Sequence, residues 1–338
     1  MTSRERVIKA LTFNNPDRPP RHLWYLPSVP QFRNDELMKF YKMFPSDISV
    51  PKYRYGAGKR AKGVPCQIGE YTDSWGSVWH VAEHGVIGEV KEYPLKDWSD
   101  LDSYELPYEL LDEADLSEVN KSCAESDLFM FVGTETRPFE RMQFLRGTEN
   151  IMMDLAYGEK KAYELRDRLH EFYVREMKMW ADTDVDGVSF MDDWGSQTSL
   201  LISPETWREF FKPLYKEYCD IMHEKGKFVF FHSDGNIESI YPDLIEIGID
   251  AINSQVFCMD IQKLADNYKG KITFWGEIDR QNILPFGTEE DVRNAVRTLK
   301  NAFYDEKGGV IAQCEWGTND PFENICAVFD EWNKLTAK

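Results

Sequence analysis

The sequence lacks long apolar runs and paired cysteines. No stretch of about 18 consecutive apolar residues occurs, so we expect no transmembrane helix and no membrane partner. The first residues, MTSRERVIKAL, have no apolar core of the kind found in signal peptides. The six cysteines are scattered without a CxxC pair, and in a cytoplasmic chain such cysteines are expected to be reduced. These absences together predict a cytoplasmic protein.

Basic residues are also scarce. Lys and Arg number 40 against 59 Asp and Glu, which gives a formal net charge of −19. Because nucleic-acid binding needs a basic surface, no nucleic-acid partner is expected, and a polyanionic substrate is disfavoured unless a local basic pocket receives it. The chain has no GxGxxG after a predicted strand and no GxxxxGK(S/T), so dinucleotide-binding and P-loop sites lose their main sequence support.

Short apolar runs alternate with helical patterns along the 338 residues. Such runs, when bounded by polar residues and glycine, are typical of buried parallel strands. Eight of them, separated by helical stretches, predict an α/β fold, a TIM (β/α)8 barrel in one domain over residues 1–338, with a doubly wound open sheet as the alternative. The alternating, Gly-rich segment 64–94 predicts an N-terminal β-hairpin insertion. The predicted strands lie near residues 21, 47, 128, 187, 228, 251, 272 and 310.

Two helix ends carry clear signals. Ser3 is expected to cap the first helix, with Glu5 in its first turn. Ser203 followed by Pro204 predicts a helix start, and that helix is expected to run to Gly226.

Four predicted strands end in side chains that can do chemistry. Because the C-terminal ends of barrel strands face the active site, these side chains are predicted to share one pocket. Of the adjacent Asp192 and Asp193, only one is expected to face inward, while the other caps a helix or pairs with a surface cation. The residues predicted for the pocket are Asp193, His232, Asp234, Glu277 and Cys314.

This set resembles the ligands of a catalytic zinc ion. His232 and Asp234 are two residues apart in an extended segment and therefore point to the same side. Glu277 and Cys314 end other strands, and a catalytic zinc needs about three protein ligands and one open position. Other interpretations remain open: His232 could be a hydrogen-bonded histidine, Asp234 a turn or cap residue, and Cys314 an apolar core residue.

Aromatic residues recur near the predicted strand ends. Trp24, Tyr25, Trp194 and Trp275 are predicted to form a wall for a flat or apolar substrate. Ordinary aromatic packing is the alternative.

Seven segments form a recognisable set: RERVIKALTFNNPDRPP at the start, FPSDIS (44–49), FLRGTEN (144–150), MDDWGSQTSLLISPETWREFFKPLYK (191–216), FFHSDGNI (230–237), PDLIEIGIDAIN (242–253) and WGEIDRQNILPFGTEEDV (275–292). On these segments the chain resembles the uroporphyrinogen decarboxylase superfamily, whose fold is a TIM barrel. Within FPSDIS, Asp47 matches the region of the family's catalytic aspartate, and the resemblance therefore implies a catalytic role for it.

The resemblance implies two competing activities. The decarboxylase proper uses no cofactor and carries an arginine-rich segment like RQAGR, whereas this chain reads RHLWYLPSVPQFR at residues 21–33. Cobamide-dependent methyltransferases of the superfamily bind zinc through a His-x-Cys pair and a Cys near the last strand. His232 and Cys314 fall on those positions, and Asp234 stands where the first Cys would be. Asp234 or Glu277 would then complete the ligand set.

An oxygen ligand in place of a thiolate leaves zinc a better Lewis acid. The resemblance therefore implies a zinc-dependent methyltransferase that moves a methyl group from a methoxylated, aromatic donor to a cobalamin-type corrinoid supplied by a partner protein. Asp193 would act as an acid/base or anchor the substrate. The alternatives are a decarboxylase, a methylcorrinoid:thiol methyltransferase, a glycosidase using Asp193 and Glu277, and a barrel that only binds.

Overall fold

The computed structural model describes residues 1–337, and its centre is a parallel eight-stranded sheet. The strands follow the order β1-β11-β10-β9-β8-β7-β6-β2. At the two ends of this order, the backbone N–H of Asp47 donates to the carbonyl oxygen of Arg21 at 2.9 Å, so the sheet curves into a barrel. The predicted TIM barrel is confirmed. Its strands are β1 (Arg21–Tyr25), β2 (Ile48–Ser49), β6 (Phe129–Gly133), β7 (Gly187–Met191), β8 (Phe228–Ser233), β9 (Ala251–Ser254), β10 (Thr273–Trp275) and β11 (Val310–Trp316).

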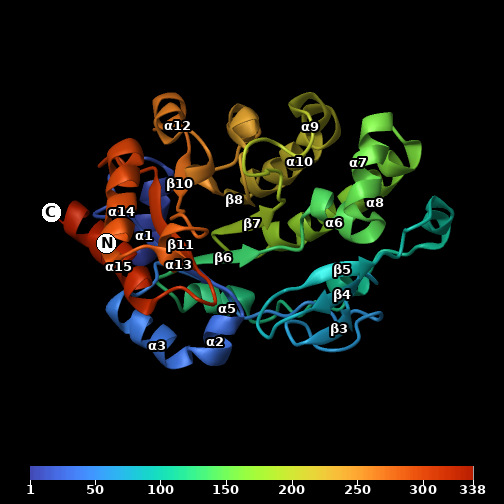
Figure 1. The fold of residues 1–338 in the computed structure, drawn as a ribbon, viewed down its shortest axis with the longest axis horizontal. Coiled ribbons are helices and arrows are strands. Elements are labelled where there is room, and N and C mark those ends of the chain that lie inside the picture. The colour runs from blue at the N-terminus through green and yellow to red at the C-terminus, as the bar shows by residue number, and fades with distance from the viewer. Residues whose placement is uncertain (338) are drawn as a thin grey trace.

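Helices surround the strands (Figure 1). They bury one apolar face against the outer surface of the barrel, as the parallel βα arrangement requires. Among residues 1–337, no helix is both long enough and apolar enough to cross a bilayer. The helices are α1 (Ser3–Leu11), α2 (Ser28–Phe32), α3 (Asn34–Met43), α4 (Glu109–Asp112), α5 (Val119–Ala124), α6 (Pro138–Arg146), α7 (Thr148–Tyr157), α8 (Lys160–Ala181), α9 (Pro204–Phe210), α10 (Lys212–His223), α11 (Tyr241–Glu246), α12 (Ile261–Tyr268), α13 (Ile283–Phe286), α14 (Glu289–Phe303) and α15 (Phe322–Thr336).

The strands separate two apolar cores. The inner core fills the barrel with large side chains such as Phe131, Phe230 and Trp275. The outer core lies between strands and helices and holds residues of opposite parity, such as Ala312 and Cys314 on β11. Successive side chains of a strand point to opposite faces, so the parity of a residue decides whether it faces the barrel interior or the helices.

The insertion contains three strands rather than the predicted hairpin. It is an antiparallel sheet in the order β3 (Gly69–Thr72), β4 (Val78–Val81) and β5 (Glu89–Glu92). The additional turn, between β3 and β4, is closed by Asp73, whose Oδ1 accepts hydrogen bonds from the backbone N–H groups of Trp75 and Ser77. This side-chain turn was the signal that the hairpin prediction missed.

The capping residues in the sequence predicted the starts of these two helices to within one residue of their positions in the structure. Thr2 caps α1 in a capping box with Glu5, while Ser3, the predicted cap, donates instead to Asp47. Ser203 caps α9 as predicted, accepting a hydrogen bond from Thr206 N at 3.0 Å. The helix expected to run to Gly226 is divided into α9 and α10 at Phe211, because a proline follows within the first turn of α10.

Candidate active site

A cavity of about 1230 Å³ opens at the C-terminal ends of the barrel strands. Asp193 follows β7, while His232 and Asp234 lie at the end of β8. Trp24 from β1 and Glu315 from β11 line the same cavity. Residues from well-separated parts of the sequence therefore meet at the face where TIM barrels carry their active sites.

Two crossing loops bring the aspartates together. The loop after β7 passes the loop after β8 so closely that a Cβ atom on Gly235 would lie 2.2 Å from the carbonyl oxygen of Gly195. Gly195 N donates to Asp234 O at 3.0 Å, and Asp234 N donates to Asp193 Oδ1 at 2.9 Å. Gly235 also has a φ of +73°, a conformation that favours glycine. The glycines therefore set the distance between the two carboxylates.

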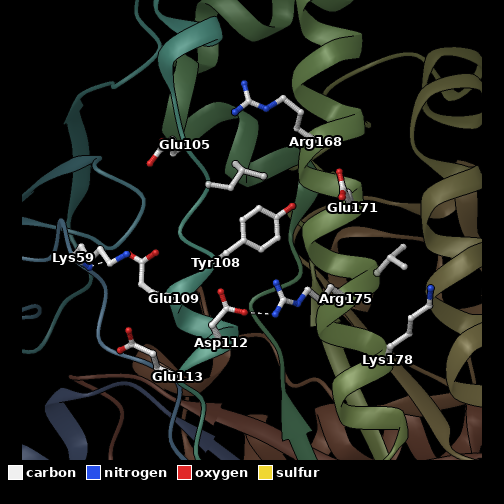
Figure 2. A pocket seen from close by; sticks show the side chains of 12 residues that line it. Lys59, Glu105, Tyr108, Glu109, Asp112, Glu113, Arg168, Glu171, Arg175 and Lys178 are labelled. Atoms are coloured by element: carbon white, nitrogen blue, oxygen red, sulfur yellow. Dashed lines mark hydrogen bonds and ion pairs between the residues drawn. The ribbon is translucent and has the colours of Figure 1, made fainter.

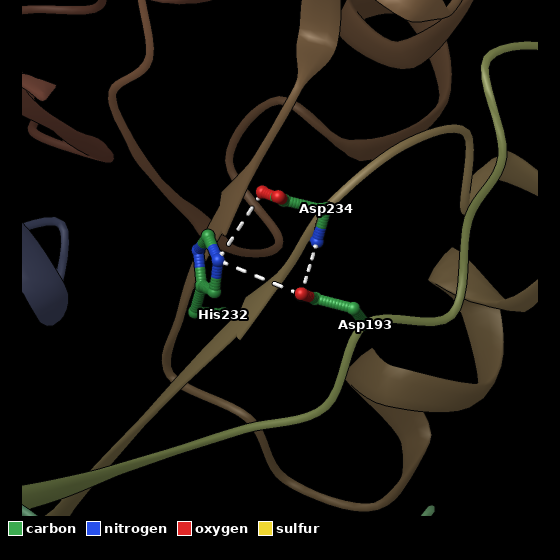
Figure 3. A group of neighbouring side chains, drawn as sticks. All are labelled: Asp193, His232 and Asp234. Carbon is green, nitrogen blue, oxygen red and sulfur yellow. Dashed lines mark hydrogen bonds and ion pairs between the residues drawn. The ribbon is translucent and has the colours of Figure 1, made fainter. Parts of the chain in front are cut away.

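Asp193, His232 and Asp234 form a cluster of three potential ligands (Figure 3). His232 Nε2 lies 3.3 Å from Asp234 Oδ1 and 3.7 Å from Asp193 Oδ1. One ligand atom from each residue lies within 4.8 Å of the other two. Within the described residues, the buried Asp234 Oδ1 has His232 Nε2 as its ion-pair partner and no other hydrogen-bond donor. Two carboxylate oxygens and one imidazole nitrogen fit a divalent metal ion with an open position.

The side chain of Asn253 orients the ring of His232 from the side opposite the aspartates. The Nδ1 atom of this ring lies 2.6 Å from Asn253 Oδ1, and the Asn253 amide group donates to the carbonyl oxygen of Trp275. Nδ1 therefore carries a proton, and Nε2 faces the aspartates. Burial acts to lower the pKa of His232, but the carboxylates of Asp234 and Asp193 raise it to about 9. The position next to Nε2 thus attracts a cation, either a proton or a metal ion.

Arg280 neutralises the acids on the other side of the cluster. Its guanidinium pairs with Asp234 and Glu315, and its Nε lies 3.6 Å from Glu277 Oε1. The contact uses Asp234 Oδ2, so Oδ1 stays available towards His232. Burial raises the pKa of Glu277 to about 7. The predicted ligand Glu277 therefore lies against Arg280 and is not one of the three clustered residues.

Comparison with known proteins places the chain in a family. Residues 77–335 match the family described as uroporphyrinogen decarboxylase (URO-D). The chain belongs to this family. No curated protein matches the chain significantly.

A solved structure shares the fold of this URO-D family member, and others match it more weakly. A methyltransferase from Methanosarcina mazei matches with a TM-score of 0.73 at 14% sequence identity, covering 100% of both chains. A sugar phosphate isomerase/epimerase from Parabacteroides distasonis matches at 11% identity with a TM-score of 0.33, covering 65% of this chain and 76% of that one. A D-psicose 3-epimerase reaches 12% identity and a TM-score of 0.38, covering 70% of this chain and 84% of that one. The first of these matches shows a common TIM-barrel fold over the whole chain.

In this URO-D barrel, Cys314 does not reach the cluster of Asp193, His232 and Asp234. It packs in the outer core with Leu23, its neighbour in β1. The adjacent Glu315 has the opposite parity, pairs with Trp24 in register, and lines the cavity. The prediction of Cys314 as a ligand is therefore not supported, because its position in the strand turns the thiol towards the helices.

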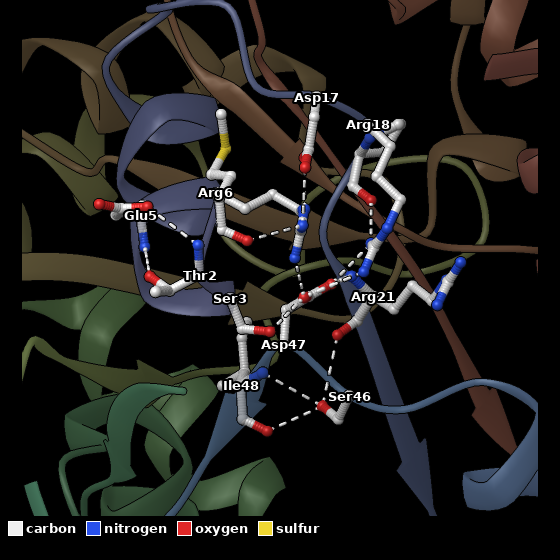
Figure 4. A network of polar contacts seen from close by, with 12 residues as sticks. Thr2, Ser3, Glu5, Arg6, Asp17, Arg18, Arg21, Ser46, Asp47 and Ile48 are labelled. Atoms are coloured by element: carbon white, nitrogen blue, oxygen red, sulfur yellow. Dashed lines mark hydrogen bonds and ion pairs between the residues drawn. The ribbon is translucent and has the colours of Figure 1, made fainter. Parts of the chain in front are cut away.

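Asp47 does not line the cavity and lies in a polar network of its own (Figure 4). It precedes β2, at the N-terminal end of the barrel, where Oδ1 accepts from Arg6 at 2.6 Å and Ser3 at 2.7 Å. Its Oδ2 accepts from Arg18 and from the backbone N–H of Arg21, both at 2.7 Å. Burial opposes ionisation, but these donors hold the pKa of Asp47 below its usual value. The Asp47 carboxylate therefore links α1 to β1 through hydrogen bonds. This structural role does not support the predicted catalytic role.

The aromatic predictions divide into two pairs. Trp24 and Tyr25 line the cavity, and the Trp24 ring lies 5.1 Å from the His232 ring. Trp275 lies beneath Trp24 in the barrel core, with ring centroids 4.7 Å apart. Trp194 is fully buried and stacks on a phenylalanine of α6, so it does not form the predicted wall.

The prediction for the aspartate pair holds for both residues. Asp193 faces the cavity, whereas Asp192 is fully buried and accepts from the backbone N–H groups of Phe139 and Glu140. Asp192 therefore satisfies the free amides at the N-terminus of α6, as a helix cap does.

The sequence-based list omitted several polar cavity residues, among them four charged ones close to the cluster or to the end of β6. Arg280 and Glu315 lie beside the cluster, and Arg137 and Glu140 come from the loop and helix that follow β6. Burial and the charge of Asp193 raise the pKa of Glu140 to about 7. The rule used for the other strands, that polar residues after a strand face the pocket, would have found the segment ETRPFE after β6.

A groove of about 990 Å³ lies outside the barrel, between α8 and residues 105–113 (Figure 2). Arg175 pairs with Asp112 in it, and Arg168 donates to the backbone carbonyl of Leu101. This groove is remote from the strand ends and is lined by four basic and five acidic side chains.

Proposed function

We propose that this chain is a methyltransferase that moves a methyl group from a methoxylated aromatic compound to a corrinoid carried by a separate protein. The observation that carries the proposal is the cluster of Asp193, His232 and Asp234 beside aromatic side chains in the barrel cavity. The whole-chain likeness to a methyltransferase from Methanosarcina mazei supports the same reaction class.

The cluster is proposed to hold zinc. When bound there, zinc would supply a Lewis acid that polarises the ether oxygen of the donor. Asp193, His232 and Asp234 would hold the ion, since their ligand atoms converge and the buried Asp234 Oδ1 has no hydrogen-bond donor other than His232 among the described residues. Compared with the expectation from sequence, Asp193 replaces Cys314 and Glu277 in the ligand set.

The remaining cavity residues would bind and orient the donor. Trp24 and Tyr25 provide a flat surface for its ring. In the proposed reaction the methyl C–O bond would break with its electron pair left on the oxygen, and a reduced corrinoid on the partner would supply the nucleophile that accepts the methyl group. Glu140, whose pKa is about 7, lies in the same cavity and can provide a proton to the departing oxygen.

The charge of the cavity argues against a substrate with many carboxylates. Arg137 and Arg280 line it, but Arg280 is already shared among three acids. Asp193, Asp234 and Glu315 face the same space. A porphyrinogen bearing many carboxylates would meet these acids, which disfavours the decarboxylase activity for which the family is named.

Metal analysis of matched variants tests the proposal. The wild type, purified without chelator, is expected to contain about one zinc per chain, and His232→Ala is expected to lose it. Cys314→Ala serves as the control and should retain the metal, because its thiol lies in the outer core. Equal zinc in the wild type and His232→Ala would contradict the assigned cluster.

The activity is tested separately. The zinc-containing protein is mixed with chemically reduced cobalamin and methoxylated aromatics, and the demethylated phenol is quantified together with the cobalt absorbance. Phenol formation that depends on His232 is expected. Release of carbon dioxide from a carboxylated substrate without phenol would favour the decarboxylase, and methylation of an added thiol by methylcobalamin would favour the thiol methyltransferase.

A further inference from the structure

A second chamber adjoins the main cavity beneath the insertion. Its volume is about 360 Å³, and Arg137 and Ile87 line both spaces. The insertion contributes Tyr71 and Trp79, whose rings stack with centroids 5.9 Å apart and an interplanar angle of 9°. Arg137 therefore stands where the two chambers meet, and the insertion forms an aromatic wall of the smaller one.

Arg137 is the least neutralised cation of the two chambers. Its nearest acid is Glu140, with Nη1 and Oε2 3.9 Å apart, beyond hydrogen-bond distance. Arg280 in the main cavity is shared by three acids, as described above. Arg141 in the second chamber lies 3.5 Å from Asp73 and 3.4 Å from Glu135. Both of those arginines are fixed by the protein itself, whereas Arg137 is free to bind a ligand.

The chamber wall also carries a surplus of hydrogen-bond donors. Arg137 Nε, Arg141 Nε and Trp75 Nε1 are buried and find no acceptor in residues 1–337. Arg141 itself is 95% buried and lies 4.3 Å from the centre of the Trp75 ring. Buried donors are normally paired, so the wall of this chamber is short of acceptors, and Arg137 is the cation in it that is left open to a ligand.

We infer that the second chamber and Arg137 form a carboxylate subsite, so that the donor is a methoxylated aromatic acid. A carboxylate matches the planar guanidinium through two parallel hydrogen bonds. The carboxylate would lie at Arg137 while the methoxyl group reaches the cluster of Asp193, His232 and Asp234. The inference deepens the proposed function, but the subsite itself binds carboxylates whether or not methyl transfer occurs. The insertion then determines which aromatic acids fit.

Paired probes test the subsite by binding alone. Isothermal titration calorimetry is run on the full-length protein with 3-methoxybenzoate, 4-methoxybenzoate and methoxybenzene. The better of the two acids is expected to bind at least tenfold more tightly than methoxybenzene, which has the same ring and ether without the carboxylate. Arg137→Gln should remove this preference and leave methoxybenzene binding unchanged, and Arg137→Lys should keep part of it.

Arg208→Gln is the charge-matched control, because Arg208 pairs with Asp243 outside both chambers. It should retain the preference, and circular dichroism confirms folding of each variant. Equal binding of acid and ether by the wild type, or equal weakening of both by Arg137→Gln, would overturn the subsite. A subsite that binds methoxybenzoates in a protein that forms no phenol would instead disprove the methyl transfer and keep the carboxylate site.

Discussion

At the scale of single residues, the site depends on a side chain that does not touch the substrate. Asn253 accepts the Nδ1 proton of His232 and donates to the carbonyl oxygen of Trp275, which fixes both the tautomer and the ring orientation. Partners behind a metal-binding histidine commonly contribute a factor of about 10–100 to metal affinity. As a proposed ligand, His232 would depend on Asn253 for the orientation of its ring.

We predict that Asn253→Ala weakens zinc binding about 10- to 100-fold, because the imidazole loses its fixed orientation. The affinity is measured by competition with a chromophoric chelator. Asn324→Ala is the control: this buried amide makes two hydrogen bonds, to Leu284 O and Gly287 O, and does not line the cavity. It should lower the melting temperature without changing zinc affinity. If both variants lost zinc equally, the loss in Asn253→Ala would be explained by general destabilisation of the fold and not by the orientation of His232.

At the scale of elements, the site is made where the loops after β7 and β8 cross. The crossing leaves no space for side chains, since Gly195 and Gly235 approach each other backbone to backbone. Asp193 and Asp234 follow the neighbouring strands β7 and β8, but this alone does not bring their carboxylates close together. The crossing brings them within one ligand shell, so the loops contribute as much to the site as the strands.

Gly235→Ala is predicted to abolish zinc binding, because its Cβ would meet the carbonyl oxygen of Gly195 at 2.2 Å and push the two loops apart. Gly226→Ala is the control that distinguishes the effect of this clash from the effect of backbone strain. Gly226 has a similar φ of +69°, but a Cβ there meets no atom of the described residues within 4 Å. Strain alone costs about 1–2 kcal/mol, so Gly226→Ala should lower stability and retain zinc. The readouts are chemical denaturation and metal content.

At the scale of the whole molecule, the sequence was sufficient to predict the barrel. The eight strands near residues 21 to 310 are all present, because each is an apolar run between helical patterns and the pattern leaves few alternatives. The third strand of the insertion was missed although Asp73, Ser74 and Gly76 mark its turn, because the prediction followed hydrophobic periodicity and included one turn only. Such a turn adds little to hydrophobic periodicity.

The site was predicted less completely, and strand parity explains one error. His232 and Asp234 were found from their i, i+2 spacing, which needs no knowledge of the strand's register. Cys314 was preferred over Glu315 because its chemistry suited zinc, although only the parity of β11 decides which of them faces inward. Asp47 was assigned by resemblance, and the motif does not tell at which end of β2 it lies.

The whole barrel also responds to pH through buried acids such as Glu176. Glu176 on α8 accepts hydrogen bonds from Tyr55, Thr136 and the backbone N–H of Glu135, and so ties this helix to segments that follow β2 and β6. Burial raises the pKa of Glu176 from its usual 4.5 to about 7. The folded state therefore binds this proton more tightly than the unfolded chain does.

One substitution can isolate the contribution of Glu176 to the pH dependence of the free energy of unfolding. Because the folded pKa is raised, the stabilising contribution of the Glu176 proton is fully present below pH 4.5 and is lost as the pH rises through 7. Glu176→Gln keeps a neutral amide at this position at every pH. The free energy of unfolding of the variant relative to wild type is therefore expected to increase between pH 5 and pH 8, by at most about 3 kcal/mol. Denaturant titrations at several pH values measure this difference, in which acids common to both proteins cancel. A difference that does not change with pH would mean that Glu176 is already ionised in the folded protein at pH 5, with its charge stabilised by the three donors.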